Sequence, residues 1–373
     1  MWRTEQVYFE TDVYFEAIIR ALDEARRSVE MEMYIFERDE LGMSVLAALE
    51  RAAGRGVSVE LVIDGLGSPD WSMSDLRELA DKGVLVRVYH PAPWPISRLF
   101  LRDGINFSRF FRVLRTLNSR NHKKVLIVDG ECAFTGSMNI TLAHRLWRET
   151  SVRVCGEEVS SLQEYFTMTW SHSYNPDLPR LRKQRRRKLS QRVAERWVRT
   201  NVTRRLRRRH NRDLADRIAR AEQRVWLTNA YFIPSPRLMR ALMRAALAGT
   251  DVRLLLPRKS DVRLVRWVSV LFYRTLIRSG VQIYEYLPAM LHAKTVLLDD
   301  RASIGTTNLN YRSLYHDLEV DVVVSQNATL QALHEQYLHD LRSAEKISED
   351  WLGQRPWFLR LAGFLGSWLK WYL

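Results

Sequence analysis

A short pattern that occurs twice constrains the fold of this 373-residue chain more than any other feature: His, one residue, Lys, four residues, Asp. The copies span residues 122–129 and 292–299. The residues between Lys and Asp are apolar and largely β-branched, so each copy is expected on a buried strand. Side chains at i and i+2 share one face of a strand, so each His and Lys should project together.

The sequence around the two copies also repeats in order. The segment VEMEMYIF in the first half resembles VWLTNAYF in the second, and a helix and a strand are expected after each. Helices are expected at residues 13–28, 41–55, 214–223 and 236–247, and strands at 29–36, 57–63, 225–232 and 252–256. Alternation of this kind predicts an α/β fold in two related halves, with helices covering a sheet.

The residues that follow each copy repeat as well. A few residues after each Asp, at residues 136–139 and 305–308, stands the sequence Gly, a hydroxyl residue, one further residue and Asn. A Glu stands 27 residues after each His. The hydroxyl, Asn and Glu positions are Ser137, Asn139 and Glu149 in the first half and Thr306, Asn308 and Glu319 in the second. The Asn and hydroxyl residues are candidate phosphate ligands. A carboxylate that returns to an imidazole fixes its tautomer and stabilises the imidazolium; the alternative is a solvated surface acid.

The two Asp residues of the pattern leave two interpretations open. Asp129 and Asp299 are candidate catalytic residues, but Asp129-Gly130 and Asp299-Asp300 are also turn signals, so they could only buttress the site. The distance from Asp to the Gly that begins the Gly-x-x-Asn sequence is seven residues in the first half, to Gly136, and six in the second, to Gly305. We expect the missing residue to shorten the turn after Asp299 and to leave the strands intact.

Charge and cysteine content limit the class of protein. The net charge is +15, but residues 180–212 hold 16 Lys and Arg against one acid, so the rest of the chain is balanced. Such a segment is expected to be a disordered or loosely helical arm that suits a polyanion. The chain has two cysteines, Cys132 and Cys155, which are too few for a disulfide scaffold or a cysteine-rich zinc site. One disulfide bridge is possible but not indicated.

The paired motifs resemble those of the phospholipase D superfamily, within which the chain is most similar to bacterial cardiolipin synthases of the branch without N-terminal transmembrane helices. The flanking stretches that carry this resemblance are MYIF, DGLGS, RNHKK, NAYF, LHAKT and NLNYRS. The resemblance implies two pseudo-symmetric lobes, each a mixed β-sheet flanked by helices, that share one active site. The expected division is lobe 1 at residues 1–178, a basic arm at 179–212, lobe 2 at 213–350 and a Trp-rich amphipathic tail at 351–373.

The chemistry of a phosphodiester assigns roles to these residues. Lys124 and Lys294 supply fixed positive charge, one imidazole attacks phosphorus and the other protonates the leaving alcohol. The resemblance implies His122 as nucleophile and His292 as general acid and base, with no cofactor; lysines stand where a metal site would have ligands. It favours phosphatidyl transfer from one phosphatidylglycerol to another, with phosphatidylethanolamine as a second candidate donor. Hydrolysis is the main alternative, followed by a nuclease or a non-catalytic scaffold.

Three apolar segments favour a membrane surface over nucleic acid as the partner. Residues 92–117 and 262–277 mix bulky apolar side chains with Arg just before each motif, which fits a lipid-entry mouth or core helices. Residues 356–373 hold three Trp and are expected to form an interfacial helix or a helix packed on the core. No signal peptide or membrane-spanning segment is apparent. The expected location is peripheral, on the cytoplasmic face of a bacterial inner membrane.

Overall fold

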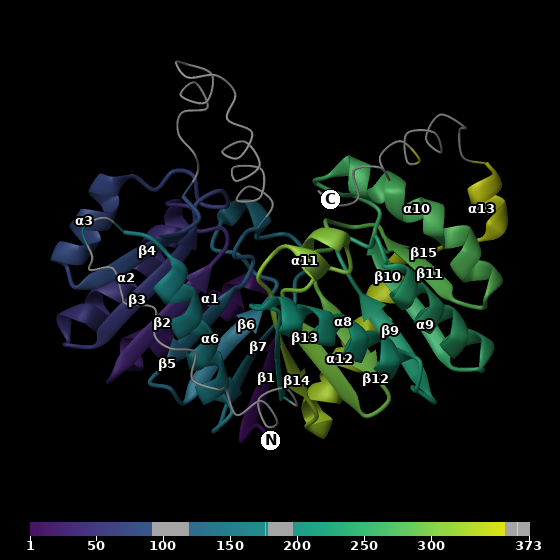
Figure 1. The fold of residues 1–373 in the computed structure, drawn as a ribbon, viewed down its shortest axis with the longest axis horizontal. Helices are drawn as coiled ribbons and strands as arrows, with labels where there is room; N and C mark the ends of the chain where they lie inside the picture. The colour runs from purple at the N-terminus through teal and green to yellow at the C-terminus, as the bar shows by residue number, and fades with distance from the viewer. Residues whose placement is uncertain (92–118, 176, 178–196, 355–363, 365–373) are drawn as a thin grey trace, which may run out of the picture.

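The computed structural model describes residues 1–91, 119–175, 177, 197–354 and 364. Two lobes, each a mixed β-sheet with helices on it, lie side by side, with lobe 1 on the left and lobe 2 on the right of Figure 1. The expected α/β fold with two sheets is confirmed. The outer helices α2 and α3 of lobe 1 and α9 and α13 of lobe 2 lie at opposite ends of the molecule (Figure 1).

Lobe 1 contains a seven-stranded sheet in the order β1-β7-β6-β5-β2-β3-β4. The strands are β1 (Thr4–Tyr8), β2 (Ser28–Met33), β3 (Ser58–Asp64), β4 (Val84–Tyr89), β5 (Val125–Val128), β6 (Cys132–Gly136) and β7 (Ser151–Cys155). The helices are α1 (Thr11–Glu24), α2 (Glu40–Gly54), α3 (Met73–Asp81) and α6 (Val159–His172), with a short 3₁₀ turn at Leu142–His144. β2, β3 and β4 are parallel, whereas β5, β6 and β7 are antiparallel.

Lobe 2 contains an eight-stranded sheet in the order β15-β11-β10-β9-β12-β13-β14-β8. The strands are β8 (Val198–Thr200), β9 (Arg224–Thr228), β10 (Asp251–Pro257), β11 (Gln282–Tyr286), β12 (Thr295–Leu298), β13 (Arg301–Gly305), β14 (Val320–Val324) and β15 (Ala344–Lys346). The helices are α8 (Arg204–Ile218), α9 (Pro236–Leu247), α10 (Arg263–Arg278), α11 (Tyr311–Tyr315), α12 (Asn327–Arg342) and α13 (Glu349–Gly353). Six strands of each sheet repeat the same order, so the internal repeat is confirmed.

The hairpin that follows each motif differs in length between the lobes. Val128 pairs with Cys132 in lobe 1, which leaves a three-residue turn, and Leu298 pairs with Arg301 in lobe 2, which leaves a two-residue turn. Asp129 and Asp299 both start their turns at positive φ, 56° and 48°, a conformation that Asp tolerates better than most residues. The expected shorter turn after Asp299 is therefore confirmed, and the strand positions are conserved between the lobes.

A shared hydrophobic core joins the two sheets. β6 and β7 pack against β13 and β14, and the cluster of buried side chains between them includes Val152, Val154, Ile304 and Val322. The Trp2 indole N–H donates to the Val323 carbonyl at 2.7 Å and so ties the start of lobe 1 to lobe 2. Separate outer cores lie under α1 and α2 in lobe 1 and under α8 and α9 in lobe 2. The inner core therefore contains side chains of both lobes, which pack into one cluster.

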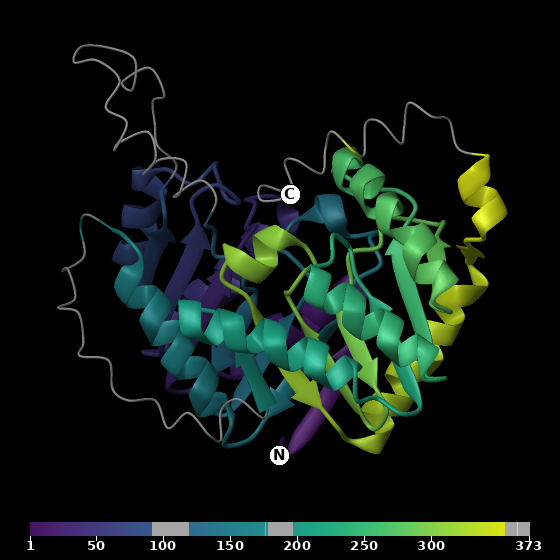
Figure 2. The ribbon, with the colours of Figure 1, turned by 45° about the vertical axis from the view of Figure 1, so that its right-hand side comes forward.

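The structure differs from the expected basic arm in its second part. Residues 198–200 form the edge strand β8 on β14, and residues 204–218 form α8, which starts when the Thr203 hydroxyl accepts from the Leu206 amide. Leu214, Ala215 and Ile218 on α8 are buried in the core of lobe 2. The helix forms because several of its basic residues, among them Arg205, Arg208 and Arg212, are exposed to water that separates their charges, while an apolar stripe faces the core. Figure 2 shows α8 crossing the front of the molecule. Residues 180–196 lie outside the described part.

The structure also shows the state of the two cysteines and the fold of the second apolar segment. Cys132 and Cys155, paired neighbours on β6 and β7, form a disulfide, which the sequence had not indicated. The segment 262–277 becomes α10, whose Val265, Val268 and Leu276 are buried while Leu271 is partly exposed, so one face packs on the core. Among the described helices, none is long and apolar enough to cross a bilayer. Residues 92–117 and most of the tail after Gly353 lie outside the described residues.

Candidate active site

The two His-Lys pairs lie at the junction of the lobes. His122 and Lys124 directly precede β5, and His292 and Lys294 directly precede β12, so the pairs stand one step before the strands expected to hold them. All four are buried, between 1% and 8% exposed. Lys124 donates to the carbonyl of His122 at 3.0 Å, and Lys294 donates to the carbonyl of His292. Each motif thus folds its lysine back beside its own histidine.

The lobes exchange backbone hydrogen bonds at each histidine. The His122 amide donates to the Leu318 carbonyl of lobe 2 at 3.0 Å, and the His292 amide donates to the Arg148 carbonyl of lobe 1 at 2.9 Å. Each of these acceptors directly precedes the Glu that stands 27 residues after the histidine of its own lobe. The exchange therefore brings the Glu of one lobe to the histidine of the other.

The carboxylates pair with the histidines across the lobes. His122 Nδ1 lies 3.1 Å from Glu319 Oε2, and His292 Nδ1 lies 2.7 Å from Glu149 Oε1. Both carboxylates are 1% exposed, so neither is a surface acid. The sequence spacing did not say which histidine each Glu would meet. With Nδ1 of each ring held by a carboxylate, the opposite nitrogen, Nε2, is the one left for a substrate.

The two carboxylates differ in charge state although their positions match. Burial raises the pKa of Glu319 to about 7. Burial also acts to raise the pKa of Glu149, but His292 and Lys294 outweigh it and hold that pKa below its usual value. Glu149 is therefore stabilised as an anion next to His292, whereas burial favours the protonated form of Glu319 next to His122.

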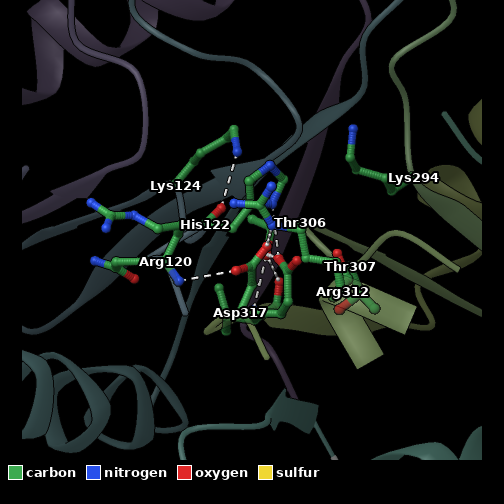
Figure 3. A network of polar contacts seen from close by, with 12 residues as sticks. Arg120, His122, Lys124, Lys294, Thr306, Thr307, Arg312 and Asp317 are labelled. Carbon is green, nitrogen blue, oxygen red and sulfur yellow. Dashed lines mark hydrogen bonds and ion pairs between the residues drawn. The ribbon is translucent and has the colours of Figure 1, made fainter. Parts of the chain in front are cut away.

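Burial and the lysines keep both imidazoles neutral in the empty site. The pKa of His122 is lowered well below its usual value by burial, Lys124 and Lys294. Burial lowers the pKa of His292 to about 4, against the opposing effect of Glu149. Burial also lowers the pKa of Lys124 to about 8 and that of Lys294 to about 7. Figure 3 shows the two lysines on either side of His122. An anion bound among these groups would raise all four pKa values.

The two hydroxyl residues that were expected to bind phosphate contact the carboxylates instead. Thr306 Oγ1 donates to Glu319 Oε2 and accepts from the Val320 amide at 3.0 Å. In lobe 1, Ser137 acts to lower the pKa of Glu149, but its hydroxyl donates to the Thr150 carbonyl at 3.0 Å. In the structure, Thr306 orients the carboxylate beside His122, and Ser137 holds the backbone next to the carboxylate beside His292.

The two asparagines keep unused polar atoms. Asn139 and Asn308 are each 2% exposed, and the Oδ1 atom of each has no hydrogen-bond partner within the described residues. The Asn139 amide nitrogen lies 3.3 Å from His144 Nδ1. Buried amide groups are normally satisfied, so both side chains have capacity for a ligand. Their expected role at the phosphate remains a prediction.

The structure does not bring Asp129 and Asp299 to the histidines. Each lies at the far end of its strand, beyond β5 or β12. Asp129 accepts from the amides of Arg26, Arg27 and Ser28 at 2.6–3.2 Å, and Asp299 accepts from the amides of residues 222–224 at 2.9–3.1 Å. Both therefore tie the hairpin to the start of the neighbouring strand. These contacts favour the second interpretation of the sequence, in which Asp129 and Asp299 stabilise the strands of the site and are not catalytic.

Two residues near His122 were not singled out as site residues from the sequence. The Tyr34 ring lies 4.7 Å from the His122 ring and 5.3 Å from Lys124 Nζ, in cation–π geometry. Arg312 on α11 helps to lower the pKa of His122 and is anchored by Asp317 at 3.1 Å (Figure 3). Both belong to flanking stretches that carried the family resemblance, MYIF and NLNYRS, so the signal was present in the sequence.

Lobe 1 supports its histidine through buried charge. Arg120 and Asp64, both fully buried, form a salt bridge at 2.8 Å, and Asp64 also accepts from the Asn121 amide at 2.8 Å. Lys123 donates to Glu32 at 2.7 Å, and Asn121 Nδ2 donates to the same carboxylate at 2.8 Å. Lys123, the first lysine of RNHKK and not part of the repeated pattern, is therefore structural. Its side chain faces away from the site because successive side chains of an extended segment point in opposite directions, and those of His122 and Lys124 point into the site.

Two related α/β lobes that bring a His-Lys pair each to one junction define a phospholipase D-like centre. Comparison with known proteins agrees with this class. The sequence matches the family described as "Cardiolipin synthase, PLD-like domain" over residues 18–170 and 214–341. The chain belongs to this family.

Relatives and solved structures extend the match over nearly the whole chain. A cardiolipin synthase of Geobacillus kaustophilus is 30% identical over 367 residues, which cover 93% of this chain and 68% of the relative. A cardiolipin synthase of Alkalihalophilus pseudofirmus is 30% identical, over 92% of this chain and 67% of the relative. The crystal structure of a phosphatidylserine synthase of Haemophilus influenzae has a similar fold, with a TM-score of 0.71, 14% identity and coverage of 100% and 97%.

Proposed function

We propose that this protein is a cardiolipin synthase that moves a phosphatidyl group from one phosphatidylglycerol to a hydroxyl of another and releases glycerol. The observation that carries the proposal is the crossed pairing of His122 with Glu319 and of His292 with Glu149, beside two buried lysines. This centre has a neutral nucleophile, an acid–base partner and fixed positive charge for a phosphodiester. Family membership supplies the substrate class.

In the first step, His122 Nε2 attacks phosphorus. The P–N bond forms and the P–O bond to the headgroup glycerol breaks, while His292 gives its proton to the departing oxygen. The bound phosphodiester anion raises the pKa of His292, and ionised Glu149 stabilises the imidazolium until the proton is transferred. Lys124 and Lys294 stabilise the charge that develops on the phosphoryl oxygens.

The second step reverses the roles of the same groups. The hydroxyl of a second phosphatidylglycerol gives its proton to His292 and attacks phosphorus, and the P–N bond to His122 breaks. Cardiolipin leaves, and His122 returns neutral while His292 is again protonated. The difference between the two carboxylates supports this assignment: the carboxylate of lowered pKa stands beside the group that must carry a proton, and the one of raised pKa stands beside the nucleophile.

The test uses labelled phosphatidylglycerol in mixed micelles with a chelator, and mass spectrometry of the products. The proposal predicts cardiolipin plus glycerol, lost in His122→Ala. Phosphatidic acid as the only product would mean that water is the acceptor and that the protein is a hydrolase. Turnover of phosphatidylethanolamine in place of phosphatidylglycerol would change the donor. No turnover of any phospholipid would favour a nuclease or a scaffold.

The proposed partner is an anionic membrane surface, and α8 supplies described basic residues for it. Arg205, Arg208 and Arg212 are exposed on this helix. Each basic residue near an anionic bilayer is worth about 1 kcal/mol of attraction. Arg205→Gln with Arg208→Gln should weaken binding to anionic liposomes but not to neutral ones. The matched control, Arg240→Gln with Arg244→Gln on α9, should bind like the wild type; equal loss in both double variants would leave only net charge as the cause.

The proposed location, peripheral on the cytoplasmic face, has a direct test in the Cys132–Cys155 pair. Disulfides persist in oxidising compartments and are rare in the cytosol. If lobe 1 faces the cytoplasm, the disulfide of the structure should be reduced in the cell, so alkylation in intact cells before lysis, followed by mass spectrometry, should find two alkylated thiols. A disulfide that resists alkylation would place this lobe on the outer side of the membrane.

A further inference from the structure

The surroundings of the two histidines differ in chemistry, and the difference bears on the alcohol that reacts. Lys124 and Lys294 act on the pKa of both histidines, and Arg312 acts in addition on that of His122. Among the described residues, the Tyr34 ring lies beside His122, whereas three rings lie around His292: Trp147 at 5.3 Å, His144 at 6.0 Å and Tyr231 at 6.3 Å between ring centroids. The His292 side is where the alcohol must lie, because His292 exchanges its proton with the alcohol oxygen in both steps of the proposed function.

An acid stands on this side, next to the anion-binding centre. The Tyr231 hydroxyl lies 2.7 Å from both oxygens of Asp261, and the Val262 amide donates to Asp261 Oδ1 at 3.0 Å. The Asp261 charge acts to raise the pKa of Lys294 and of His144, so it lies within electrostatic reach of both. Asp261 is exposed, which leaves acceptor capacity on both oxygens for a ligand.

A carboxylate at this place repels a phosphate but accepts hydrogen bonds from hydroxyl groups. In lobe 1 the residue that corresponds to Asp261 lies in the turn Gly65–Ser68, which carries no acid, and the residue that corresponds to Tyr231 is Ile35. The acid and its tyrosine are therefore particular to the His292 side. Trp147 and His144 stack at 3.5 Å and 14°, and form a flat wall beside the same histidine.

We propose that Asp261, held by Tyr231, binds the middle hydroxyl of the headgroup glycerol and so selects the alcohol. This inference rests on the proposed function. In the donor, the reacting oxygen of the headgroup is bonded to a methylene carbon, and the next carbon carries the middle hydroxyl. In the acceptor, the attacking hydroxyl at the other end of the glycerol has the same neighbour. One carboxylate therefore serves the leaving alcohol in the first step and the attacking alcohol in the second.

The test is a competition between two alcohols for one covalent intermediate. Wild-type protein is given labelled phosphatidylglycerol with equal amounts of deuterated glycerol and 1,3-propanediol, and the two phosphatidyl products are measured by mass spectrometry. 1,3-Propanediol lacks the middle hydroxyl but keeps both terminal ones. The product ratio reports the acceptor step alone, because both products form from the same intermediate. The wild type should favour glycerol by about tenfold or more, as expected for a hydrogen bond to a charged group.

The variants separate a binding role from a structural one. In Asp261→Ala the ratio should fall to about one while the sum of transfer and hydrolysis products stays measurable. Tyr231→Phe, which keeps the acid but removes its anchor, should give an intermediate ratio. Asp81→Ala, an exposed acid at the end of α3, should keep the wild-type ratio.

Three outcomes would overturn the inference. An unchanged ratio in Asp261→Ala would remove Asp261 from alcohol selection, and so would a wild-type ratio near one. In both cases phosphatidyl alcohols still form, so the proposed function stands. If the wild type forms neither cardiolipin nor a phosphatidyl alcohol, the proposed function itself fails, and the inference fails with it.

Discussion

Lobe 1 and lobe 2 present the same His-Lys pair directly before the equivalent strand of the same kind of sheet, but they support it differently. Behind His122, lobe 1 buries Lys123 against Glu32. At the corresponding positions lobe 2 has Ala293 and Thr228, which carry no charge. Lobe 1 thus places an ion pair behind its histidine, and lobe 2 places uncharged side chains behind the equivalent histidine. The charge behind His122 is therefore not a requirement of the fold.

The same comparison extends to what lies in front of the histidines. The nucleophile proposed for lobe 1 has a carboxylic acid of raised pKa beside it, supplied by lobe 2; the acid–base group proposed for lobe 2 has an ionised carboxylate, supplied by lobe 1. Two imidazoles of one site must occupy opposite protonation states during the reaction. The asymmetry of their surroundings supplies the difference that the symmetric motifs lack.

The largest expected effect comes from the two crossed carboxylates. Glu149→Gln removes the negative charge beside His292 and should lower kcat by roughly 10²- to 10⁴-fold, as for an acid that orients and stabilises an imidazolium. Glu319→Gln replaces an acid whose pKa burial already raises toward the neutral form, and should cost about tenfold. The measurement is kcat for cardiolipin formation in both variants. Equal losses would contradict the asymmetry between the lobes.

The next effect tests the buried ion pair of lobe 1. Lys123→Ala leaves the Glu32 carboxylate buried without its cation and should lower the free energy of unfolding by about 3–5 kcal/mol. The triple variant Lys123→Ala, Glu32→Thr, Asn121→Leu gives lobe 1 the uncharged set that lobe 2 uses, and should recover most of that loss. Urea unfolding of both variants measures this. A triple variant no more stable than the single one would show that lobe 1 needs its charges.

The lysines should give the pH profile an alkaline limb that differs between lobes. Lys294, with its pKa lowered to about 7, loses its charge first, and Lys124 follows at about 8. In the free enzyme kcat/KM should therefore fall above about pH 7, because the deprotonated lysine no longer attracts the phosphodiester. The fall in kcat should come at higher pH, since bound phosphate raises both pKa values.

Arginine variants identify which lysine sets that limb. Lys294→Arg keeps its charge and should move the fall in kcat/KM up to about pH 8, although the rate itself is lower. Lys124→Arg should leave the fall near pH 7. A kcat/KM that stays level to pH 10 in the wild type would show that neither lysine titrates in this range.

The smallest effect concerns the aspartates of the two motifs. Asp129→Asn weakens its hydrogen bonds to three backbone amides and should cost about 1–2 kcal/mol of stability, with kcat within about twofold of the wild type. Its pKa is held below the usual value by those amides, although burial acts to raise it. The stabilisation is therefore present above about pH 4 and is lost as the pH falls through the folded-state pKa.

Thermal unfolding of Asp129→Asn against pH measures this. The gap to wild type should close below about pH 4, and Asp299→Asn should behave in the same way in lobe 2. A large loss of kcat in a variant that remains folded would return either residue to the catalytic machinery.

Local sequence patterns predicted much of this molecule and failed where the answer depends on the other lobe. The apolar runs before Asp129 and Asp299 predicted the central strands, and the one-residue difference in spacing predicted the shorter second turn. The pairing of Glu149 with His292 could not be read from either motif. This pairing arises from contacts between residues of the two lobes that are more than 140 positions apart in the chain. The charge of 197–212 hid the apolar stripe that folds α8 onto lobe 2.

The central claim is that His122 is the nucleophile and His292 the acid–base group. The most direct measurement quenches the enzyme at alkaline pH during turnover of labelled phosphatidylglycerol and maps the phosphatidyl adduct by peptide mass spectrometry. The account predicts an adduct on His122 that accumulates in His292→Ala and is absent from His122→Ala. An adduct on His292, or one that persists in His122→Ala, would reverse the assignment of the lobes.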